Sequence, residues 1–324
     1  PLNYCVSSHE ITNQGYWSGD SGQWHSRTCR IKRRSPAATR KCLRRVSLTF
    51  VGDSIVGQVS EFLRSGLVSC ADDNELLRCD DPIWPESAPD YKSYVEMCRK
   101  NRKNPCLVHS SEGVAPYVFS LSLFLPLFTK NNVLKTNTYR HKHPRYNLAL
   151  IKGTLPISLH DFEQSLTLHT WTSRRSSSEL DDPMKVSIAV LNAASTWQIA
   201  YGSLDLWRTY LPGVLAQAVR EFDRVIFVTA TAVHPSLLYN RFGWNKKRWM
   251  TSTRVVAMNA LSTEIIRRDF ADKVEIVDWW ALTINRGNDS KDPTDMRHYG
   301  HDTISEMMQV LLHSVCGDHG AEVL

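Results

Sequence analysis

The sequence lacks several patterns that would assign it to a class at once. Its 324 residues contain no apolar run that approaches the roughly 18 residues a membrane-spanning helix needs. The longest candidate, 118–128, is interrupted by Pro126, and we expect a buried strand and its edge there. Helix-turn-helix, zinc-finger and RNP-type patterns are absent, and so are the glycine-rich motifs that bind phosphates. We therefore predict no nucleic-acid partner and no bound nucleotide.

Closely spaced Cys-x-x-Cys pairs are also missing, which argues against a zinc ribbon. His141 and His143 lack the further ligands of a metal site, so we predict no metal. The eight cysteines are nevertheless informative, because seven of them lie in the first 106 residues and the eighth lies near the end: Cys5, Cys29, Cys42, Cys70, Cys79, Cys98, Cys106 and Cys316. An even number with loose spacing favours disulfides in an oxidising compartment, and scattered free thiols are the alternative.

The connectivity of the cysteines cannot be read from the sequence, although one pairing would tie Cys316 and the C-terminal helix to the N-terminal region. A sequon, Asn288-Asp289-Ser290, gives weak support for a protein of the secretory pathway. The chain begins at Pro1 rather than Met, which leaves room for a signal or membrane anchor outside it. We expect the protein in the secretory pathway, either in the Golgi lumen or secreted.

The net charge of +6 is gathered in clusters at 27–45, 99–103 and 140–145. Solvated loops that keep the protein soluble are one interpretation of such clusters. An anionic glycan partner is the other, and both stay open.

The order of apolar patterns predicts an α/β protein with a mostly parallel sheet. Short apolar runs predict strands at 46–51, 186–191, 224–229 and 273–278. Helical spacing predicts helices over 56–67, 204–222, 253–268 and 301–315, with Pro212-Gly213 as a break or a fresh start within the second. We predict one domain over 1–324, in which 1–45 is a segment bearing cysteine and tryptophan and 68–116 is a loop-rich insertion.

Ser54 is the first candidate for chemistry. It ends a Gly52-Asp53-Ser54 tripeptide that follows the first predicted strand and precedes a helix. Reactive groups of open α/β sheets collect at the carboxyl ends of the strands, and a serine there has its backbone N–H near the positive end of the helix. Asp53 or Ser54 as a plain helix cap is the alternative.

A serine nucleophile also needs a base and a group that orients the base. Asp295 and His298 lie three residues apart on a loop before the last helix. At that spacing the carboxylate can accept from the imidazole Nδ1–H and leave Nε2 free for Ser54. A loop carboxylate and a solvated histidine are the alternatives.

Together these motifs resemble the SGNH (GDSL-type) hydrolase superfamily. They resemble most the PC-esterase branch, which includes the trichome-birefringence-like polysaccharide O-acetyltransferases and the luminal domain of sialate O-acetyltransferase. The resemblance also covers the cysteine- and tryptophan-bearing N-terminal segment, 191–197 and 278–298. It implies an α/β/α sandwich, with Ser54 as nucleophile, His298 as general base and Asp295 as its orienting carboxylate.

Two departures from the family pattern concern the site. The cysteines that flank the Asp-x-x-His histidine in plant members are absent, and so is the Gly-x-Asn-Asp block of ordinary members. Asn192 and the backbone N–H of Ser54 are the nearest oxyanion donors, and a structural role in a turn is the alternative for Asn192. Further candidates for contacting substrate are Arg297, Trp197 and Asp53, and capping of nearby carbonyls is the alternative for Arg297. The tryptophans that could stack on sugars, with core packing as the alternative, are Trp197, Trp244, Trp249, Trp279 and Trp280.

The resemblance implies O-acetyl transfer to glycan hydroxyls through an acetyl-serine, with acetyl-CoA or an acetyl ester as donor and no bound cofactor. The charge clusters favour an acidic or sialylated acceptor. A carbohydrate acetylesterase and an inactive glycan-binding module are the alternatives.

Overall fold

The computed structural model describes residues 2–19, 22–43, 46–52, 54–69, 118–119, 135–140, 147–152, 186–192, 204–234, 250–289 and 297–317. Five strands form one sheet in the order β4-β3-β7-β8-β9, and every neighbouring pair is parallel. They are β4 (Val118–Phe119), β3 (Val46–Gly52), β7 (Val186–Leu191), β8 (Arg224–Val228) and β9 (Val274–Val277). The prediction of an α/β fold with a mostly parallel sheet is confirmed.

The strand sequences explain why this sheet lies in the interior. In β7, Ile188 and Val190 belong to one buried cluster, while Ala189 and Leu191 belong to another on the opposite face. Successive side chains of a strand point to opposite faces, so a run that is apolar throughout requires cover on both.

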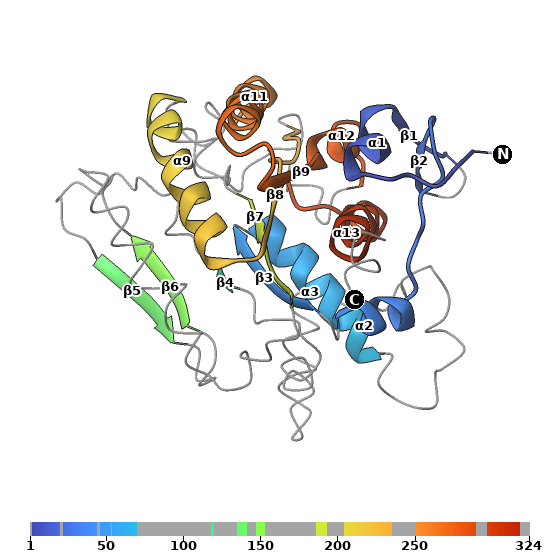
Figure 1. Cartoon of the computed structure of the whole chain (residues 1–324), viewed down its shortest axis with the longest axis horizontal. Helices are drawn as coiled ribbons and strands as arrows, with labels where there is room; N and C mark the ends of the chain where they lie inside the picture. Colours follow the sequence, from blue (N-terminus) through green and yellow to red (C-terminus); the bar gives the residue numbers. More distant parts are fainter. Residues whose placement is uncertain are drawn as a thin grey trace.

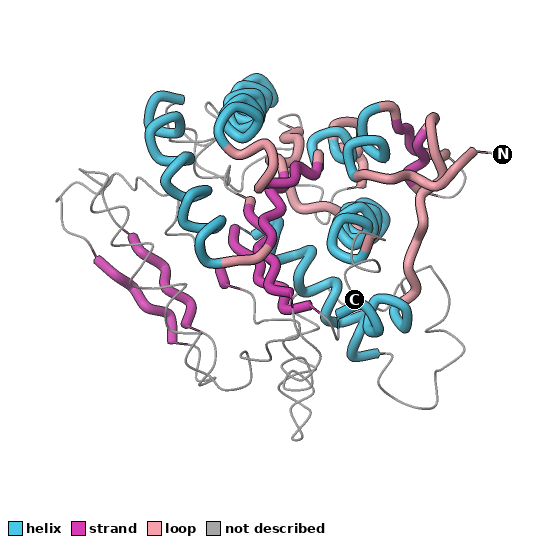
Figure 2. The backbone as a smooth tube through the Cα atoms, viewed as in Figure 1, coloured by secondary structure: helices cyan, strands magenta, loops and turns pink. Residues whose placement is uncertain are grey.

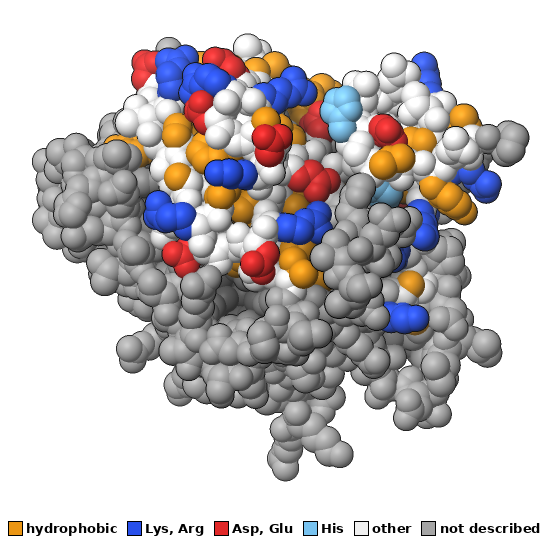
Figure 3. Space-filling view, in the orientation of Figure 1, with side chains coloured by type: hydrophobic (Ala, Val, Ile, Leu, Met, Phe, Trp, Pro, Cys, Tyr) orange, Lys and Arg blue, Asp and Glu red, His pale blue; other side chains and the backbone are white. Residues whose placement is uncertain are grey.

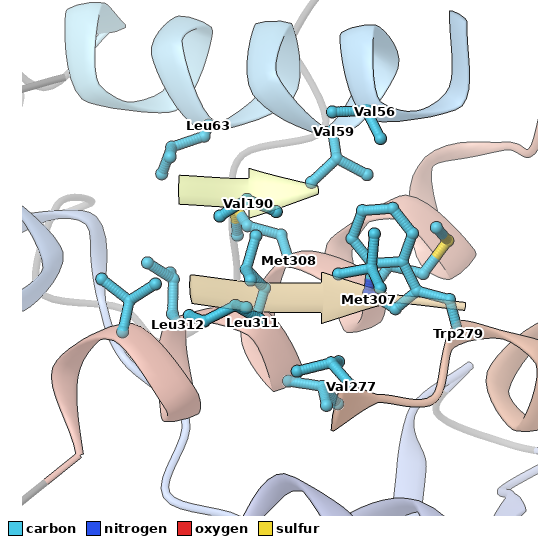
Figure 4. Close-up of a cluster of buried hydrophobic side chains, with 14 of the residues drawn as sticks. Val56, Val59, Leu63, Val190, Val277, Trp279, Met307, Met308, Leu311 and Leu312 are labelled. Carbon is cyan, nitrogen blue, oxygen red and sulfur yellow. The ribbon is translucent and has the colours of Figure 1, made fainter. Parts of the chain in front are cut away.

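Helices supply that cover on each face (Figures 1 and 2). On one face lie α9 (Leu204–Glu221) and α11 (Ser252–Asp269). On the other lie α3 (Ser54–Ser69) and α13 (His301–Cys316), with the short helix α12 (Trp279–Thr283) beside them. Figure 4 shows apolar side chains of α3, the sheet and α13 meeting in one cluster. The arrangement has the three layers of an α/β/α sandwich.

The N-terminal segment packs against the α13 side of the molecule (Figure 1). It contains α1 (Ser8–Asn13), the antiparallel pair β1 (Gly15–Trp17) and β2 (Trp24–Ser26), and α2 (Pro36–Leu43). The disulfide Cys5–Cys29 closes this segment, and Cys42–Cys316 joins α2 to the end of α13. The expectation that Cys316 ties the C-terminal helix to the N-terminal region is therefore confirmed.

The segment also covers the edge of the sheet, because Ser8 Oγ donates to the carbonyl oxygen of Ile276 in β9 at 3.2 Å. An edge strand that is covered in this way does not offer its main chain to other molecules.

Other expectations about helices and strands are only partly met or lie outside the described residues. Pro212 does not end a helix, since α9 runs through it. Of the apolar run 118–128, the structure describes only the two residues of β4. The helix after Ser54 extends to Ser69, and the rest of the insertion predicted at 68–116 lies outside the described residues. The antiparallel pair β5 (Lys135–Arg140) and β6 (Asn147–Lys152) was not predicted. The single-domain organisation stays a prediction.

Candidate active site

The carboxyl edge of the sheet has one point at which the strand order reverses along the chain. The chain leads from β3 to β4 on one side of it, and later strands, beginning with β7, add on the other side. Open α/β sheets bind ligands at such a point, because the connections part there and leave a crevice. Val51 of β3 pairs with Leu191 of β7, so Gly52 and Asn192 are the next residues along neighbouring strands. Gly52 and Asn192 therefore lie at this crevice.

The N-terminus of α3 points at the same place. β3 ends at Gly52 and α3 begins at Ser54, which is the first residue of a 16-residue helix. The first N–H groups of a helix have no partner within it, and together with the helix dipole they favour negative charge. The strand predicted before Ser54 and the helix predicted after it are confirmed at the level of the main chain.

One face of α3 packs along the segment that leads into α13. Gln58, one turn after Ser54, donates from Nε2 to the carbonyl oxygen of Tyr299 at 2.6 Å. One turn further, the rings of Phe62 and His301 meet edge to face with centroids 5.1 Å apart. Residues four apart lie on one side of a helix, so position 54 belongs to the same row of α3 as Gln58 and Phe62.

The segment around His298 is held firmly on its other sides. His298 is half-buried, while Arg297 is 4% and Tyr299 2% exposed. The Tyr299 hydroxyl donates to the carbonyl oxygen of Ala232, beyond the end of β8, at 2.8 Å. The main-chain N–H of Gly300 donates to the carbonyl oxygen of Asp289 at 2.8 Å. Arg297, considered for substrate contact, lies in the interior.

His234 is a titratable group that the sequence did not single out. Its Nε2 lies 3.1 Å from the carbonyl oxygen of Thr283 and 3.4 Å from the Tyr299 hydroxyl. Burial lowers the pKa of His234, and the hydrogen bond with Thr283 opposes that shift in part. The His234 ring also packs edge to face against the Tyr299 ring, with centroids 6.1 Å apart. Its position after a predicted strand was the only sequence signal for it.

Asn192 is 2% exposed, and its side chain faces β8. Its Nδ2 lies 3.5 Å from the carbonyl oxygen of Val228 and 3.4 Å from that of Thr229. These distances are longer than ordinary N–H···O bonds, which measure about 2.7–3.2 Å. The Oδ1 atom has no hydrogen-bond partner among the residues that the structure describes. The oxyanion role of Asn192 stays a prediction.

A pocket of about 750 Å³ opens at the other end of the carboxyl edge. It is lined by Thr229, Val256, Asn259, Ala260, Thr263, Glu264, Arg267, Arg268, Asp278 and Trp280. Thr229 and Asp278 follow β8 and β9, and the Thr229 hydroxyl donates to Asp278 Oδ1 at 2.8 Å. Trp280 lines the pocket, whereas Trp279 is fully buried in the core. The pocket lies beside β8, β9 and α11, whereas Ser54 follows β3 at another position of the sheet, so we do not base the chemistry on it.

The predicted site residues fall into two groups. The structure describes the main chain of Ser54 and all of Asn192, Arg297 and His298. Asp53, Asp295 and Trp197 lie outside the described residues, as do Trp244 and Trp249. The triad of Ser54, His298 and Asp295 therefore stays a prediction.

Within the described ranges, no group of three or more His, Cys, Asp or Glu side chains could hold a metal ion. No helix in the same ranges is long and apolar enough to cross a bilayer.

Comparison with known proteins gives no family assignment. No family model matches the sequence, and no curated protein matches it. Among solved structures, a lipase/acylhydrolase from Enterococcus faecalis has a TM-score of 0.33 at 13% identity, over 53% of this chain and 77% of that chain. LAE5, an α/β hydrolase enzyme from the metagenome of Lake Arreo, Spain, has a TM-score of 0.32 at 11% identity, over 83% of this chain and 94% of that chain. Neither of these two structures enters the functional argument.

Proposed function

We propose that the protein is a serine-dependent acyltransferase that moves acetyl groups to glycan hydroxyls. One observation carries the proposal: the face of α3 that begins at Ser54 packs, through Gln58 and Phe62, along the segment 298–301. This packing supports a serine and an imidazole meeting at the crevice of the sheet, which is the arrangement that nucleophilic catalysis requires.

In the proposed mechanism, Ser54 Oγ attacks the carbonyl carbon of an acetyl ester or thioester while His298 Nε2 takes its proton. The backbone N–H of Ser54 and the amide of Asn192 donate to the oxyanion. His298 then returns the proton to the departing alcohol or thiol, and acetyl-Ser54 remains. A sugar hydroxyl, deprotonated by His298, then attacks the acetyl carbonyl carbon, and the imidazolium returns that proton to the departing Ser54 Oγ. Asp295 holds the imidazole and stabilises its charged form.

The acceptor separates this proposal from a carbohydrate acetylesterase, in which water takes the place of the sugar. The resemblance to polysaccharide and sialate O-acetyltransferases favours transfer to a glycan. The two disulfides are those of an oxidising, secretory-type compartment, and within it the Golgi lumen or the extracellular space is our proposal. The donor would be acetyl-CoA or an acetyl ester.

The structure bears on the charge of the acceptor. Within the basic cluster 27–45, Arg33 pairs with Glu306 at 2.8 Å, and Arg34 donates to the carbonyl oxygen of Cys316. These arginines serve packing, while Arg27 and Arg30 remain exposed. Figure 3 shows basic and acidic side chains interspersed over the face formed by α9 and α11. Of these four arginines, only Arg27 and Arg30 are exposed, so they are the two that support an acidic acceptor.

The test is labelling of the purified protein with a fluorophosphonate, together with hydrolysis of p-nitrophenyl acetate. We expect wild type to label and to turn over, and Ser54→Ala and His298→Gln to do neither. Ser60→Ala is the matched control, because it removes a buried hydroxyl without a hydrogen-bond partner in the described residues from the same helix. Absence of labelling in a folded wild-type protein would overturn the proposal and favour an inactive glycan-binding module.

A second measurement separates transferase from esterase. Acetyl-donor consumption is followed with and without a panel of acidic and neutral glycans, and acetylated glycan is quantified by mass spectrometry. Transfer that exceeds hydrolysis supports the transferase, whereas hydrolysis unaffected by any glycan supports the esterase.

A further inference from the structure

We propose that Gln58 is a positioning residue that fixes His298 relative to Ser54, an inference that rests on the proposed function. Gln58 shares a helix with Ser54, and its amide holds the main chain of Tyr299, the neighbour of His298. A single side chain thereby links the helix of the nucleophile to the segment of the base.

The linkage is short at both ends. On α3, Ser54 and Gln58 are one helical turn apart and lie on one side of the helix. On the other segment, the bond from Gln58 Nε2 ends on the carbonyl oxygen of Tyr299, at 2.6 Å. Between the bonded carbonyl and the imidazole of His298 lies one residue of main chain.

Tyr299 makes this contact rigid. Its ring is buried, and its hydroxyl donates to the carbonyl oxygen of Ala232 at 2.8 Å. His234 packs edge to face on the same ring, with centroids 6.1 Å apart. Tyr299 is thus held through its main chain by α3 and through its ring by the segment after β8. His298, directly before it, has little freedom to change its distance from α3.

The chemistry of the bond shows why glutamine suits this place. A carbonyl oxygen accepts only from a donor, and the amide supplies an N–H without adding charge beside the base. A glutamate of the same shape cannot donate when ionised, and a methionine of similar length has no donor. Displacement of a reacting group by about 1 Å can cost roughly 100-fold in rate.

Loss of this bond need not unfold the protein. The packing of α3 depends on Val56, Val59 and Leu63, which point into the core beside α13 (Figure 4). Glutamate and methionine also have helix propensities close to that of glutamine. Gln58→Glu and Gln58→Met should therefore fold.

Kinetics of p-nitrophenyl acetate hydrolysis give the first readout. We expect kcat to fall about 10- to 100-fold in both variants, with KM within about twofold of wild type. The acidic limb of the pH–rate profile should move to higher pH in Gln58→Glu only, because a nearby carboxylate favours the imidazolium form of His298. A role of Gln58 in stability alone would not move that limb.

Gln309→Met is the matched control. Gln309 is a buried glutamine of α13 whose amide accepts from Arg34 N–H at 2.8 Å and donates to the carbonyl oxygen of Arg34 at 2.9 Å. This variant should lose thermal stability at least as much as Gln58→Met and keep the kcat of wild type.

An NMR measurement tests whether Gln58 fixes the position of the His298 ring, and it does not depend on catalytic activity. In protein labelled at histidine, the His298 ring signal is assigned by its loss in His298→Gln. We expect that signal to shift or to broaden in Gln58→Met and to remain in place in Gln309→Met. An unchanged His298 signal in both Gln58 variants, or an unchanged kcat, would overturn the inference. A wild-type protein that neither labels nor hydrolyses ester would refute the proposed function instead, and the His298 signal would still report on Gln58.

Discussion

The carboxylate of Asp289 caps α13 from outside the helix, by accepting from the main-chain N–H of Thr303 at 3.0 Å and from its hydroxyl at 2.5 Å. The residue at the N-cap position is Gly300, which has no side chain to do so. A Cβ at Gly300 would lie 2.1 Å from Asp289 Oδ1, so the glycine makes room for the distant cap.

The first prediction follows from this pair. Asp289→Ala should lower the free energy of unfolding by about 1–2 kcal/mol, because a helix loses its cap. Gly300→Ala should cost a similar amount, since its methyl group expels the same carboxylate. The two losses of stability should not add in the double variant, because the Asp289 carboxylate that the new methyl group at position 300 would displace is already absent. Chemical denaturation of the four proteins measures this, with Asp272→Ala on an exposed turn as control. Full additivity would show that the two residues act independently.

The second prediction concerns pH. Burial raises the pKa of Glu306, and the Arg33 guanidinium opposes that shift. In Arg33→Met the opposition is gone, so the folded protein holds the Glu306 proton to higher pH than the unfolded chain does. Stability of the variant should therefore fall as pH rises from about 5 to 8, more steeply than that of wild type. The loss should reach about 3–5 kcal/mol at the alkaline end, as for a broken buried pair.

Unfolding curves at several pH values test this expectation. Arg224→Met is the control, because Arg224 and Glu275 form a pair that is more than one-third exposed on each side. A loss in Arg33→Met that is the same at every pH would contradict the argument.

The third prediction concerns the two disulfides in the part of the chain that the structure describes. Cys5 and Cys29 are 24 residues apart in sequence, whereas Cys42 and Cys316 are 274 apart. The chain-entropy model makes the longer loop worth about 2 kcal/mol more. The double variant Cys42→Ser/Cys316→Ser should therefore unfold at a lower denaturant concentration than Cys5→Ser/Cys29→Ser. Peptide mapping without reduction should recover both pairs from wild type, and a different pairing would refute this part of the fold.

The fourth prediction separates two asparagines that contact the main chain at the carboxyl end of β8, Asn192 after β7 and Asn259 of α11. Asn192 makes long contacts to β8, whereas Asn259 accepts from and donates to the main chain of Ala230, both at 2.9 Å. Asn192→Ala should lower kcat about 100- to 1000-fold, as expected for loss of an oxyanion donor. Asn259→Ala should reduce stability and leave kcat unchanged. Equal kcat values in the two variants would remove Asn192 from the mechanism.

The sheet and its main helices were predictable because their signals are local. In Val186–Leu191 and Arg224–Val228, nearly every residue is apolar, and strands buried on both faces require that. The helix over 252–269 was predicted within one residue at each end, since its apolar residues recur at helical spacing.

The rest depends on partners far away in the sequence. Arg33 and Arg34 belong to a run that resembles solvated charge, yet Glu306 and Gln309, which hold them, lie more than 270 residues later. The contact of Gln58 could not be predicted from the sequence either, because its partner is a main-chain carbonyl oxygen, which every residue has. The strands of the N-terminal hairpin have three residues each, too few to show a period, and a disulfide beside them helps to hold them.

The position of α13 has a consequence for biosynthesis. A ribosome makes Ser54 before His298, which follows 244 residues later, and before Cys316, which follows later still. At about 5–20 residues per second, the nascent chain spends at least ten seconds without its last helix. During that time α3 lacks Tyr299 and α2 lacks the thiol that secures it. The proposed nucleophile therefore lacks its proposed base until His298 has been made, and a protein truncated before His298 should be inert toward esters.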